Sequence, residues 1–499
     1  MSDTVEANEN PAPFVQDGPT PLFGWNEFMA ATGGRTVGPS AQQVTGISID
    51  TRTLKPGDAF FAIRGDRFDG HDFASQAMRA GASVLVIDQA RAIALSSLQI
   101  PKIITPNVLK ALENTGQAAR ARTDAAVLAV TGSVGKTTTK EMLRAICLPS
   151  GETHAASASH NNHWGVPLTL VRMPASTRFG VFEIGMNHAG EIRTLVKMVR
   201  PQVAAITRIA PAHLGQFDSV NQIAAAKAEI LEGIEPGGIA VLNHDDDYFK
   251  SLVARAREVG VERLRTFGTH EGASVRLIAR APGEAGPARV SIDGIDFTLS
   301  LALPGRHNVM NALCALAVAT AAGVEPASAV AALSRMKPVE GRGTREALAY
   351  GDGTIALIDE SYNANPASME AALEVLGNAS PTAQGRRVAV LGDMLELGTH
   401  ASGLHAALAE PVLASDAELV LLVGDEMTAL AKALEGKVEV YHRPNAEAME
   451  QLAFKALREG DVVMVKASNG TGLGRLVGAL RKASQASESA NSEAGQGAR

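Results

Sequence analysis

The stretch AAVLAVTGSVGKTTTK (residues 125–140) joins a short apolar run to a glycine-rich loop and then to a helix-like segment. A short apolar run bounded in this way is typical of a buried parallel strand. Glycine lets backbone N–H groups approach phosphate oxygens, and the following helix adds the positive end of its dipole. Lys136 would neutralise the β and γ phosphates, and Thr137 would offer its hydroxyl to Mg²⁺. The stretch therefore predicts a nucleotide-binding α/β domain.

The spacing within this loop departs from the usual phosphate-loop pattern G-x-x-x-x-G-K-[ST]. That pattern needs glycine at position 130, where this chain has Val130. The alternative is a glycine-rich turn with a purely structural role, but packing alone does not explain a Lys-Thr pair directly after glycine at a helix start. The predicted nucleotide-binding residues of the loop are Gly132, Ser133, Val134, Gly135, Lys136, Thr137 and Thr138.

Strand-like and helix-like patterns alternate around the loop, as in doubly wound α/β domains. Apolar segments such as VAAITRIA (203–210) continue the pattern downstream, and TIALIDE (354–360) opens a second alternating block. Five segments are predicted: a disordered tail at 1–20, a small N-terminal α/β domain at 21–122, a central nucleotide-binding parallel-sheet domain at 123–338, a C-terminal Rossmann-like α/β domain at 339–481, and a disordered tail at 482–499.

Composition excludes several classes of protein. The 499 residues are 45% hydrophobic and 20% charged, which excludes a wholly disordered chain. Four acids and no Lys or Arg lie in the first twenty residues, so −4 of the net charge of −7 belongs to that tail. The nearly neutral remainder argues against a nucleic-acid partner. The two cysteines, Cys147 and Cys314, do not indicate a disulfide scaffold.

No apolar run approaches the roughly 18–20 residues of a membrane span. The N-terminus has acids where a signal peptide needs a basic region. We therefore expect a cytoplasmic protein without a membrane span.

Three further residues are candidates for a metal site. Glu183 ends the apolar run VFE, and a carboxylate at the end of a central strand would lie beside the phosphate loop. The alternative is a helix-capping or surface acid. His213 in APAHLG also follows a strand, and Lys227 lies in the Ala-rich segment AAAKAEIL. By residue type alone, a satisfied structural histidine and a solvated lysine are the ordinary interpretations of these two positions.

Several longer motifs accompany these residues: DTRTLKPGDAFFAIRG and DGHDF (within 50–73), NNHWGVPLTL (161–170), FEIGMNHAGEI (182–192), IDESYNANPASM (358–369) and LGDMLELG (391–398). With them the chain resembles the Mur ligases, ATP-dependent amide-forming enzymes of peptidoglycan precursor synthesis, over roughly residues 44–470. The phosphate loop of that family also lacks the first glycine. The resemblance implies a three-domain α/β architecture, in which the N-terminal domain at 21–122 binds the UDP-linked substrate and the central domain at 123–338 binds ATP. The motifs favour the branch that adds D-alanyl-D-alanine to UDP-MurNAc-tripeptide.

The resemblance also assigns roles to the metal-site candidates. Glu183 and His213 resemble Mg²⁺ ligands, together with Thr137. Lys227 resembles the lysine that the family carbamylates, which turns a cation into an oxygen ligand for a second Mg²⁺. The catalytic residues implied by the resemblance are Lys136, Lys227, His213 and Arg342.

Further binding residues follow from the resemblance. Asn308 and Asn311 in GRHNVMNA (305–312) would lie near the nucleotide base, Arg342 would reach the γ-phosphate, and Asp359 would also contact the nucleotide. The implied substrate-binding residues are Asp50, Thr51, Arg52, Gly65, Asn161, Asn162, Tyr362, Asn363 and Asn365. Two departures from the family pattern are Arg208, where many relatives have Asn, and Lys466-Ala467-Ser468, which stands for a K-G-S segment.

The implied function is an ATP-dependent ligase that works through an acyl phosphate, with small-molecule substrates and as a monomer. Alternatives within the superfamily are the Mur enzyme that adds the third amino acid and a folylpolyglutamate synthetase. The segment SYNANP (361–366) weighs against both, and the chain has no DNPR-type motif. A nucleotide-binding switch without catalysis is a further alternative, against which the full metal set weighs.

Overall fold

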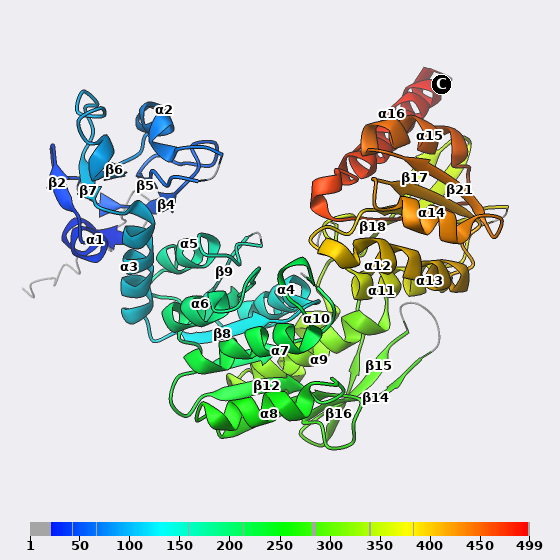
Figure 1. The fold of residues 1–499 in the computed structure, drawn as a ribbon, viewed down its shortest axis with the longest axis horizontal. Helices are drawn as coiled ribbons and strands as arrows, with labels where there is room; N and C mark the ends of the chain where they lie inside the picture. Colours follow the sequence, from blue (N-terminus) through cyan, green and yellow to red (C-terminus); the bar gives the residue numbers. More distant parts are fainter. Residues whose placement is uncertain are drawn as a thin grey trace, which may run out of the picture. The chain divides into compact units, whose positions relative to one another are not determined.

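The computed structural model describes residues 21–497, except positions 42, 66, 158, 213, 282–285, 339–340 and 383, and without the side chains of 488–497 (Figure 1). The predicted tail at 1–20 lies outside the described residues. The chain divides into two compact units. The first unit holds the described residues up to Thr123 together with Leu170–Ala175, and the second unit holds the rest.

The first unit is a small α/β layer. Its elements are β1 (Phe23–Gly24), α1 (Trp25–Thr32), β2 (Arg35–Val37), β3 (Gln43–Val44), β4 (Gly46–Ser48), β5 (Asp58–Phe61), α2 (Ala74–Arg79), β6 (Val84–Asp88), β7 (Lys102–Thr105) and α3 (Val108–Ala121). The main sheet has the order β2-β7-β6-β5-β4, in which only β2 runs antiparallel to its neighbour. Phe28 and Phe61 meet edge to face at 6.0 Å in its core.

A nine-stranded sheet forms the central half of the second unit. Its strands are β8 (Ala126–Thr131), β9 (Thr153–Ala155), β10 (Phe179–Glu183), β11 (Val203–Ile206), β12 (Ile239–Asn243), β13 (Arg263–Gly268), β14 (Val275–Arg280), β15 (Ala288–Ile292) and β16 (Ile295–Leu299). The order is β16-β15-β14-β13-β12-β11-β8-β10-β9. All neighbours are parallel except β14, β15 and β16, which pair antiparallel. The phosphate loop therefore follows a strand enclosed between two parallel neighbours.

Helices cover both faces of this central sheet (Figure 1). They are α4 (Lys136–Cys147), α5 (Gly165–Val171), α6 (Glu191–Val199), α7 (Val220–Ala228), α8 (Phe249–Glu258), α9 (Arg306–Ala321) and α10 (Pro326–Ser334). Helices α4, α9 and α10 pack against one another. Helix α9 is rich in alanine, so it can lie close to its neighbours, and most of its residues are buried in the largest core cluster.

A six-stranded sheet forms the C-terminal half of the second unit. Its strands are β17 (Thr344–Tyr350), β18 (Gly353–Glu360), β19 (Arg387–Gly392), β20 (Leu419–Val423), β21 (Glu439–Arg443) and β22 (Val462–Lys466). The order is β17-β18-β22-β19-β20-β21, and only β17 is antiparallel. The helices are α11 (Pro366–Gly377), α12 (Ala401–Ala407), α13 (Ala409–Ala414), α14 (Thr428–Leu434), α15 (Ala446–Ala456) and α16 (Gly474–Gly497). The predicted α/β fold class, with a small N-terminal, a central and a C-terminal Rossmann-like part, is confirmed.

Helix α16 corrects the predicted tail at 482–499. It continues to Gly497. Ser484 on this helix is buried, and its Oγ accepts a 2.8 Å hydrogen bond from the Ala349 N–H of β17. One turn earlier, Arg481 pairs with Glu346 and with the buried Asp359. Low sequence complexity therefore did not predict disorder here, because the alanines of this segment favour helix and its inner residues reach β17.

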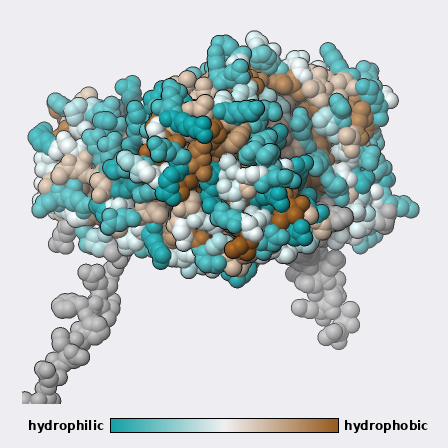
Figure 2. Space-filling model, turned by 90° about the horizontal axis from the view of Figure 1, so that it is seen from below, coloured by the Kyte–Doolittle hydropathy of each residue, from teal (hydrophilic) through white to brown (hydrophobic). Residues whose placement is uncertain are grey.

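No helix among the described residues is long and apolar enough to cross a membrane. The face drawn in Figure 2 is largely hydrophilic, with apolar side chains in smaller patches.

Candidate active site

The phosphate loop lies between β8 and α4, as the sequence predicts. Lys136 folds back over it, and its Nζ donates to the Gly132 carbonyl at 2.8 Å. Burial lowers the pKa of Lys136; the charge of Arg342 lowers it further, while Glu183 opposes the shift. Among the described residues, the hydrogen bonds of this half-buried ammonium go to loop carbonyls. Such a group is suited to an anionic ligand, because phosphate oxygens would neutralise it.

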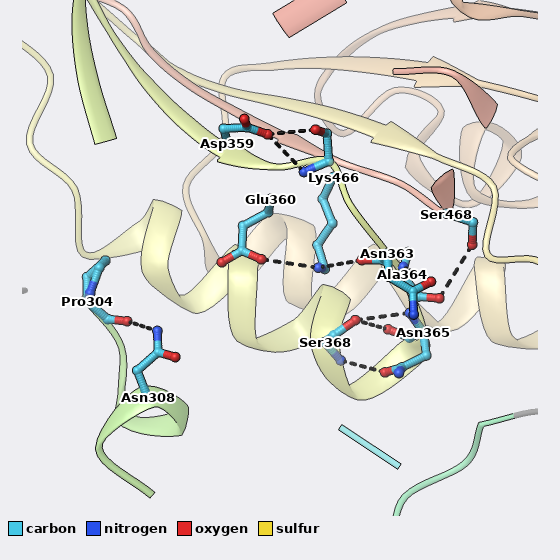
Figure 3. Close-up of polar contacts among 11 residues, drawn as sticks. Pro304, Asn308, Asp359, Glu360, Asn363, Ala364, Asn365, Ser368, Lys466 and Ser468 are labelled. Carbon is cyan, nitrogen blue, oxygen red and sulfur yellow. Dashed lines mark hydrogen bonds and ion pairs between the residues drawn. The ribbon is translucent and has the colours of Figure 1, made fainter. Parts of the chain in front are cut away.

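Gly135 is the residue before α4 and has a φ of +83°, a backbone conformation that favours glycine. A Cβ at this position would also collide with the Asn311 side chain. Asn311 thus packs directly on the loop from helix α9. Asn308, one turn earlier on the same helix, is buried, and its amide donates to the Pro304 carbonyl at 2.7 Å (Figure 3).

A polar cluster adjoins the loop. The Thr137 hydroxyl donates to Glu183 Oε2 at 2.7 Å, and the Asn161 amide donates to Glu183 Oε1 at 2.7 Å. The Ser159 hydroxyl lies 3.2 Å from that of Thr137. Glu183 ends strand β10, the parallel neighbour of β8, so adjacent strand ends bring its carboxylate to Thr137. These side chains supply the oxygen atoms that Mg²⁺ prefers.

No group of three His, Cys, Asp or Glu side chains that could hold a metal occurs among the described residues. This does not conflict with the oxygen cluster, because protein Mg²⁺ sites use one or two carboxylates completed by water and phosphate oxygens. His213, predicted as a metal ligand, lies outside the described residues.

Lys227 lies on α7 with 1% of its surface exposed. Burial, and then the charge of Lys136, lowers its pKa well below that of an ordinary lysine. This environment favours the uncharged amine more than that of a solvated surface lysine does.

Arg342 comes from the C-terminal half. It stands between Gly341 and Gly343, which have φ values of +72° and +82°. Its guanidinium lies over the Tyr362 ring at 4.2 Å and donates to Ser159 Oγ at 3.3 Å. A residue distant in sequence thus reaches the loop that adjoins the oxygen cluster.

Lys466 adds another cation to the same wall. It is buried, and its Nζ donates to the Asn363 carbonyl at 3.0 Å and lies 3.5 Å from Glu360 Oε2 (Figure 3). Burial lowers the pKa of Lys466, as does the charge of Arg342, whereas Glu360 raises it.

Two predicted substrate residues cap helices. Asn365 begins α11, where its Oδ1 accepts from the Ser368 N–H at 2.9 Å while the Ser368 hydroxyl accepts from the Asn365 N–H (Figure 3). Asn162 Oδ1 accepts from the N–H groups of Trp164 and Gly165 at the start of α5. Helix capping therefore uses the side-chain oxygen of each of these two asparagines.

Asp359, predicted to contact the nucleotide, is 1% exposed and does not line the cavity described below. Its carboxylate accepts from the Ser361 N–H and hydroxyl and pairs with Arg481 at 3.0 Å. These bonds compensate the buried charge of Asp359, and through Arg481 they connect its carboxylate to α16 and not to the cavity.

The remaining predicted substrate residues lie in the first unit. Asp50 and Arg52 form an ion pair, and the hydrogen bond from Arg52 lowers the pKa of Asp50. Thr51 lies between them in the same turn, and the Gly65 N–H donates to the Phe68 carbonyl at 2.9 Å.

A cavity of about 980 Å³ in the second unit joins these groups. Among the predicted residues, its lining includes Ser133, Val134, Gly135, Lys136, Thr137, Thr138, Asn161, Asn162, Glu183, Asn308, Asn311, Arg342, Tyr362, Asn363 and Asn365. Gly132 and Lys227 are not among the lining residues. Arg208, a noted departure from the family pattern, lines it too, as does Lys466, whereas the other departure, Ala467, does not. Ser159 and Glu360, which the sequence analysis missed, also line the cavity. A serine in the loop ASASH carries no distinctive signal, whereas Glu360 stands next to Asp359 in a quoted motif.

The two halves of the second unit also touch through a pair of glycines. The Gly215 N–H donates to the Glu396 carbonyl at 3.0 Å, and a Cβ on Gly398 would stand 2.7 Å from the Gly215 Cα. Glu396 has a φ of +67°, which is uncommon for a residue other than glycine. Only residues without side chains permit so close a backbone approach.

Comparison with known protein families matches three domains along the chain. The catalytic domain of the Mur ligase family matches residues 43–131, the Mur ligase middle domain matches 130–319, and the glutamate ligase domain of Mur ligases matches 344–469.

Individual relatives agree with these matches. The UDP-N-acetylmuramoyl-tripeptide–D-alanyl-D-alanine ligase of Escherichia coli is 34% identical over 445 residues, which cover 87% of this chain and 93% of the relative. The enzyme of the same name from Bacillus subtilis is 32% identical, with 89% and 95% covered. The crystal structure of MurF from Acinetobacter baumannii is 29% identical, with a TM-score of 0.81, and the match covers 93% of this chain and 100% of that chain.

Proposed function

Since this chain belongs to the Mur ligase family, we propose that it is the ATP-dependent ligase that joins D-alanyl-D-alanine to UDP-MurNAc-tripeptide. The product is UDP-MurNAc-pentapeptide, a precursor for peptidoglycan synthesis. Relatives that match over most of their length carry this activity in their names. ATP and a UDP-linked sugar are intracellular metabolites, so the proposed site of action is the cytoplasm, where the enzyme acts as a monomer.

The observation that carries the proposal is that the phosphate loop and Arg342 face one cavity. Lys136 and Arg342 both line it, and the charge of Arg342 contributes to lowering the pKa of Lys136. Two positively charged groups that face one cavity repel each other, and this repulsion costs free energy unless an anion lies between them. The γ-phosphate of ATP is an anion of the required charge, and the N-terminus of α4 points at the same place.

In the first step, a carboxylate oxygen of the tripeptide attacks the γ-phosphorus of ATP. The new O–P bond forms as the bond to the bridging β–γ oxygen breaks, and ADP leaves with that electron pair. Lys136, Arg342 and the loop N–H groups stabilise the negative charge on the transferring group. The product is an acyl phosphate, whose phosphate is a far better leaving group than hydroxide.

The residues that would hold Mg²⁺ are Thr137 and Glu183, with His213 implied by family resemblance. The oxygen cluster fits this role because Thr137 and Glu183 already lie within one hydrogen bond of each other. When bound, the metal would supply charge neutralisation for the phosphates.

Lys227 is proposed to be carbamylated. A buried, uncharged amine can attack CO₂, whereas an ammonium cannot, and the lowered pKa of Lys227 provides the uncharged form. The carbamate carries a negative charge, which would pair with the nearby Lys136 and provide oxygen atoms for a second Mg²⁺.

In the second step, the neutral amine of D-alanyl-D-alanine attacks the acyl carbon, and a tetrahedral intermediate expels phosphate as the amide forms. Water would hydrolyse the acyl phosphate, so the cavity must exclude it. The C-terminal half supplies Arg342, Tyr362 and Lys466 to the wall opposite the phosphate loop, which allows closure over the reacting groups.

The test is phosphate release from ATP and Mg²⁺ with UDP-MurNAc-tripeptide, with and without D-alanyl-D-alanine. We expect release that requires both substrates, together with formation of UDP-MurNAc-pentapeptide. Release with a dipeptide precursor and a diamino acid instead would assign the enzyme that adds the third residue. Absence of ATP turnover with every amine acceptor would favour a nucleotide-binding switch.

A further inference from the structure

Ser159 lies where three segments of the second unit meet. It follows strand β9, and its hydroxyl is 3.2 Å from that of Thr137 on helix α4 and 3.3 Å from the Arg342 Nη2 of the C-terminal half. It therefore stands between a predicted metal ligand and the arginine proposed to contact the γ-phosphate.

The direction of these hydrogen bonds follows from the two groups at the ends of the series, the Arg342 guanidinium and the Glu183 carboxylate. A guanidinium can only donate, and an ionised carboxylate can only accept. Thr137 donates its single hydroxyl proton to Glu183, so its oxygen accepts from Ser159. The Ser159 oxygen in turn accepts from Arg342. The result is a directed series of hydrogen bonds from Arg342 through Ser159 and Thr137 to Glu183.

The loop that carries Ser159 is held on both sides. On one side, the buried Lys140 Nζ donates to the Ala156 carbonyl at 2.8 Å, and Lys140 also pairs with Glu141. On the other side, Asn161 donates to Glu183 and accepts from the Gly185 N–H through its carbonyl. The same helix thus carries Thr137 and, one turn later, the lysine that fixes the Ser159 loop.

We propose that Ser159 is a positioning residue that couples the docking of Arg342 to the orientation of Thr137 and Glu183. Its proton holds the Thr137 hydroxyl aimed at Glu183, which leaves the second lone pair of the Thr137 oxygen for a metal ion. Its oxygen gives Arg342 a partner on the opposite wall of the cavity. The inference rests on the proposed function and adds to it a residue that the family resemblance did not assign.

The test compares three variants. Ser159→Ala removes the hydroxyl, Ser159→Thr keeps it, and Ser157→Ala is a matched control at an exposed serine two positions earlier in the loop. The measurements are the Mg²⁺ concentration for half-maximal phosphate release and, without turnover, the Mg²⁺-dependent affinity for ADP by calorimetry. We expect Ser159→Ala to raise the Mg²⁺ requirement about five- to tenfold, the effect of one hydrogen bond. Ser159→Thr should restore it, and Ser157→Ala should match the unmodified enzyme.

A double-variant cycle tests the coupling. If Ser159 acts together with Arg342, adding Ser159→Ala to Arg342→Ala should cost much less than it does alone. Additive losses would overturn the coupling. A lowered melting temperature with an unchanged Mg²⁺ requirement would overturn the positioning role and leave Ser159 as a structural residue. If the unmodified enzyme showed no D-alanyl-D-alanine-dependent release, the proposed function would fail, whereas the ADP calorimetry would still decide the role of Ser159.

Discussion

Lys136 and Lys227 form an electrostatic pair of like charge: after burial itself, the charge of Lys136 is what lowers the pKa of Lys227. One lysine stands at the end of the phosphate loop, where α4 begins, and the other lies on α7. Holding two ammonium groups in one buried region costs free energy, so the site is set up to gain negative charge at both positions.

Replacement of Lys136 tests the nucleotide end of this pair. We expect Lys136→Ala to lower ATP turnover by about a hundredfold or more, because charge on the transferring phosphoryl group is no longer neutralised. Phosphate release under saturating substrates measures the effect. Lys197→Ala, at an exposed lysine on α6, is the control and should retain full activity. Near-native turnover of Lys136→Ala would refute the assignment of the phosphate loop.

Replacement of Lys227 tests the carbamate. Lys227→Ala should be nearly inactive, and millimolar formate or acetate should partly restore activity, because a free carboxylate can occupy the space of the carbamate. The measurement is phosphate release against carboxylate concentration, with chloride at equal ionic strength as the control. A fully active variant would contradict the carbamate role, as would a rescue that chloride reproduces.

Lys466 predicts a pH dependence of stability. Its folded pKa lies below 10.5, the ordinary value for lysine. Below the folded pKa both states are protonated, and the cost of burying the charge is present in full. Between the folded pKa and 10.5 the unfolded chain holds one more proton, so the free energy of unfolding rises with pH. Urea unfolding between pH 7 and 10 should show this rise, and Lys466→Met should flatten it. An equal slope in Lys466→Met and in the exposed control Lys432→Met would contradict the prediction.

The contact between Gly215 and Gly398 predicts sensitivity to a single methyl group. Gly215→Ala places a Cβ 3.0 Å from the Gly398 nitrogen, so the two halves of the second unit should close less well. We expect kcat to fall several-fold, with a small change in stability. Gly403→Ala on α12 is the control, because a Cβ there meets nothing within 4 Å. Equal kcat values for the two variants would show that closure does not depend on this contact.

The sequence predicts the parts of the site that are local along the chain. The apolar run before Gly132 and the Lys-Thr pair after Gly135 depend on neighbouring residues, so strand, loop and helix follow from their order. The strand that ends at Glu183 is recognisable in the same way. Its contact with Thr137 follows from the adjacency of β8 and β10, which a doubly wound sheet predicts.

Contacts between distant segments could not be predicted in this way. Asp359 stands in a motif rich in polar residues. Its carboxylate nevertheless accepts a hydrogen bond from Arg481, which lies more than a hundred residues away in the sequence. Ser159 accepts a hydrogen bond from Arg342, which is 183 positions later in the chain. Asn365 combines a place in the cavity wall with a helix cap, and the motif alone does not separate the two roles.

The segment Leu170–Ala175 makes the first unit discontinuous in the chain. The backbone passes between the units after residues 123, 169 and 175, so three covalent links join them. A fragment that ends at 123 would lack Arg172, whose Nε donates to the Ile47 carbonyl at 2.8 Å. Because the chain is linear, a protease cut at any one of the three links would give two pieces that are held together only by non-covalent packing, such as that of the 170–175 segment within the first unit. The first unit thus cannot be exchanged between ligases as a simple N-terminal module, and a functional chimaera must exchange the 170–175 segment with it.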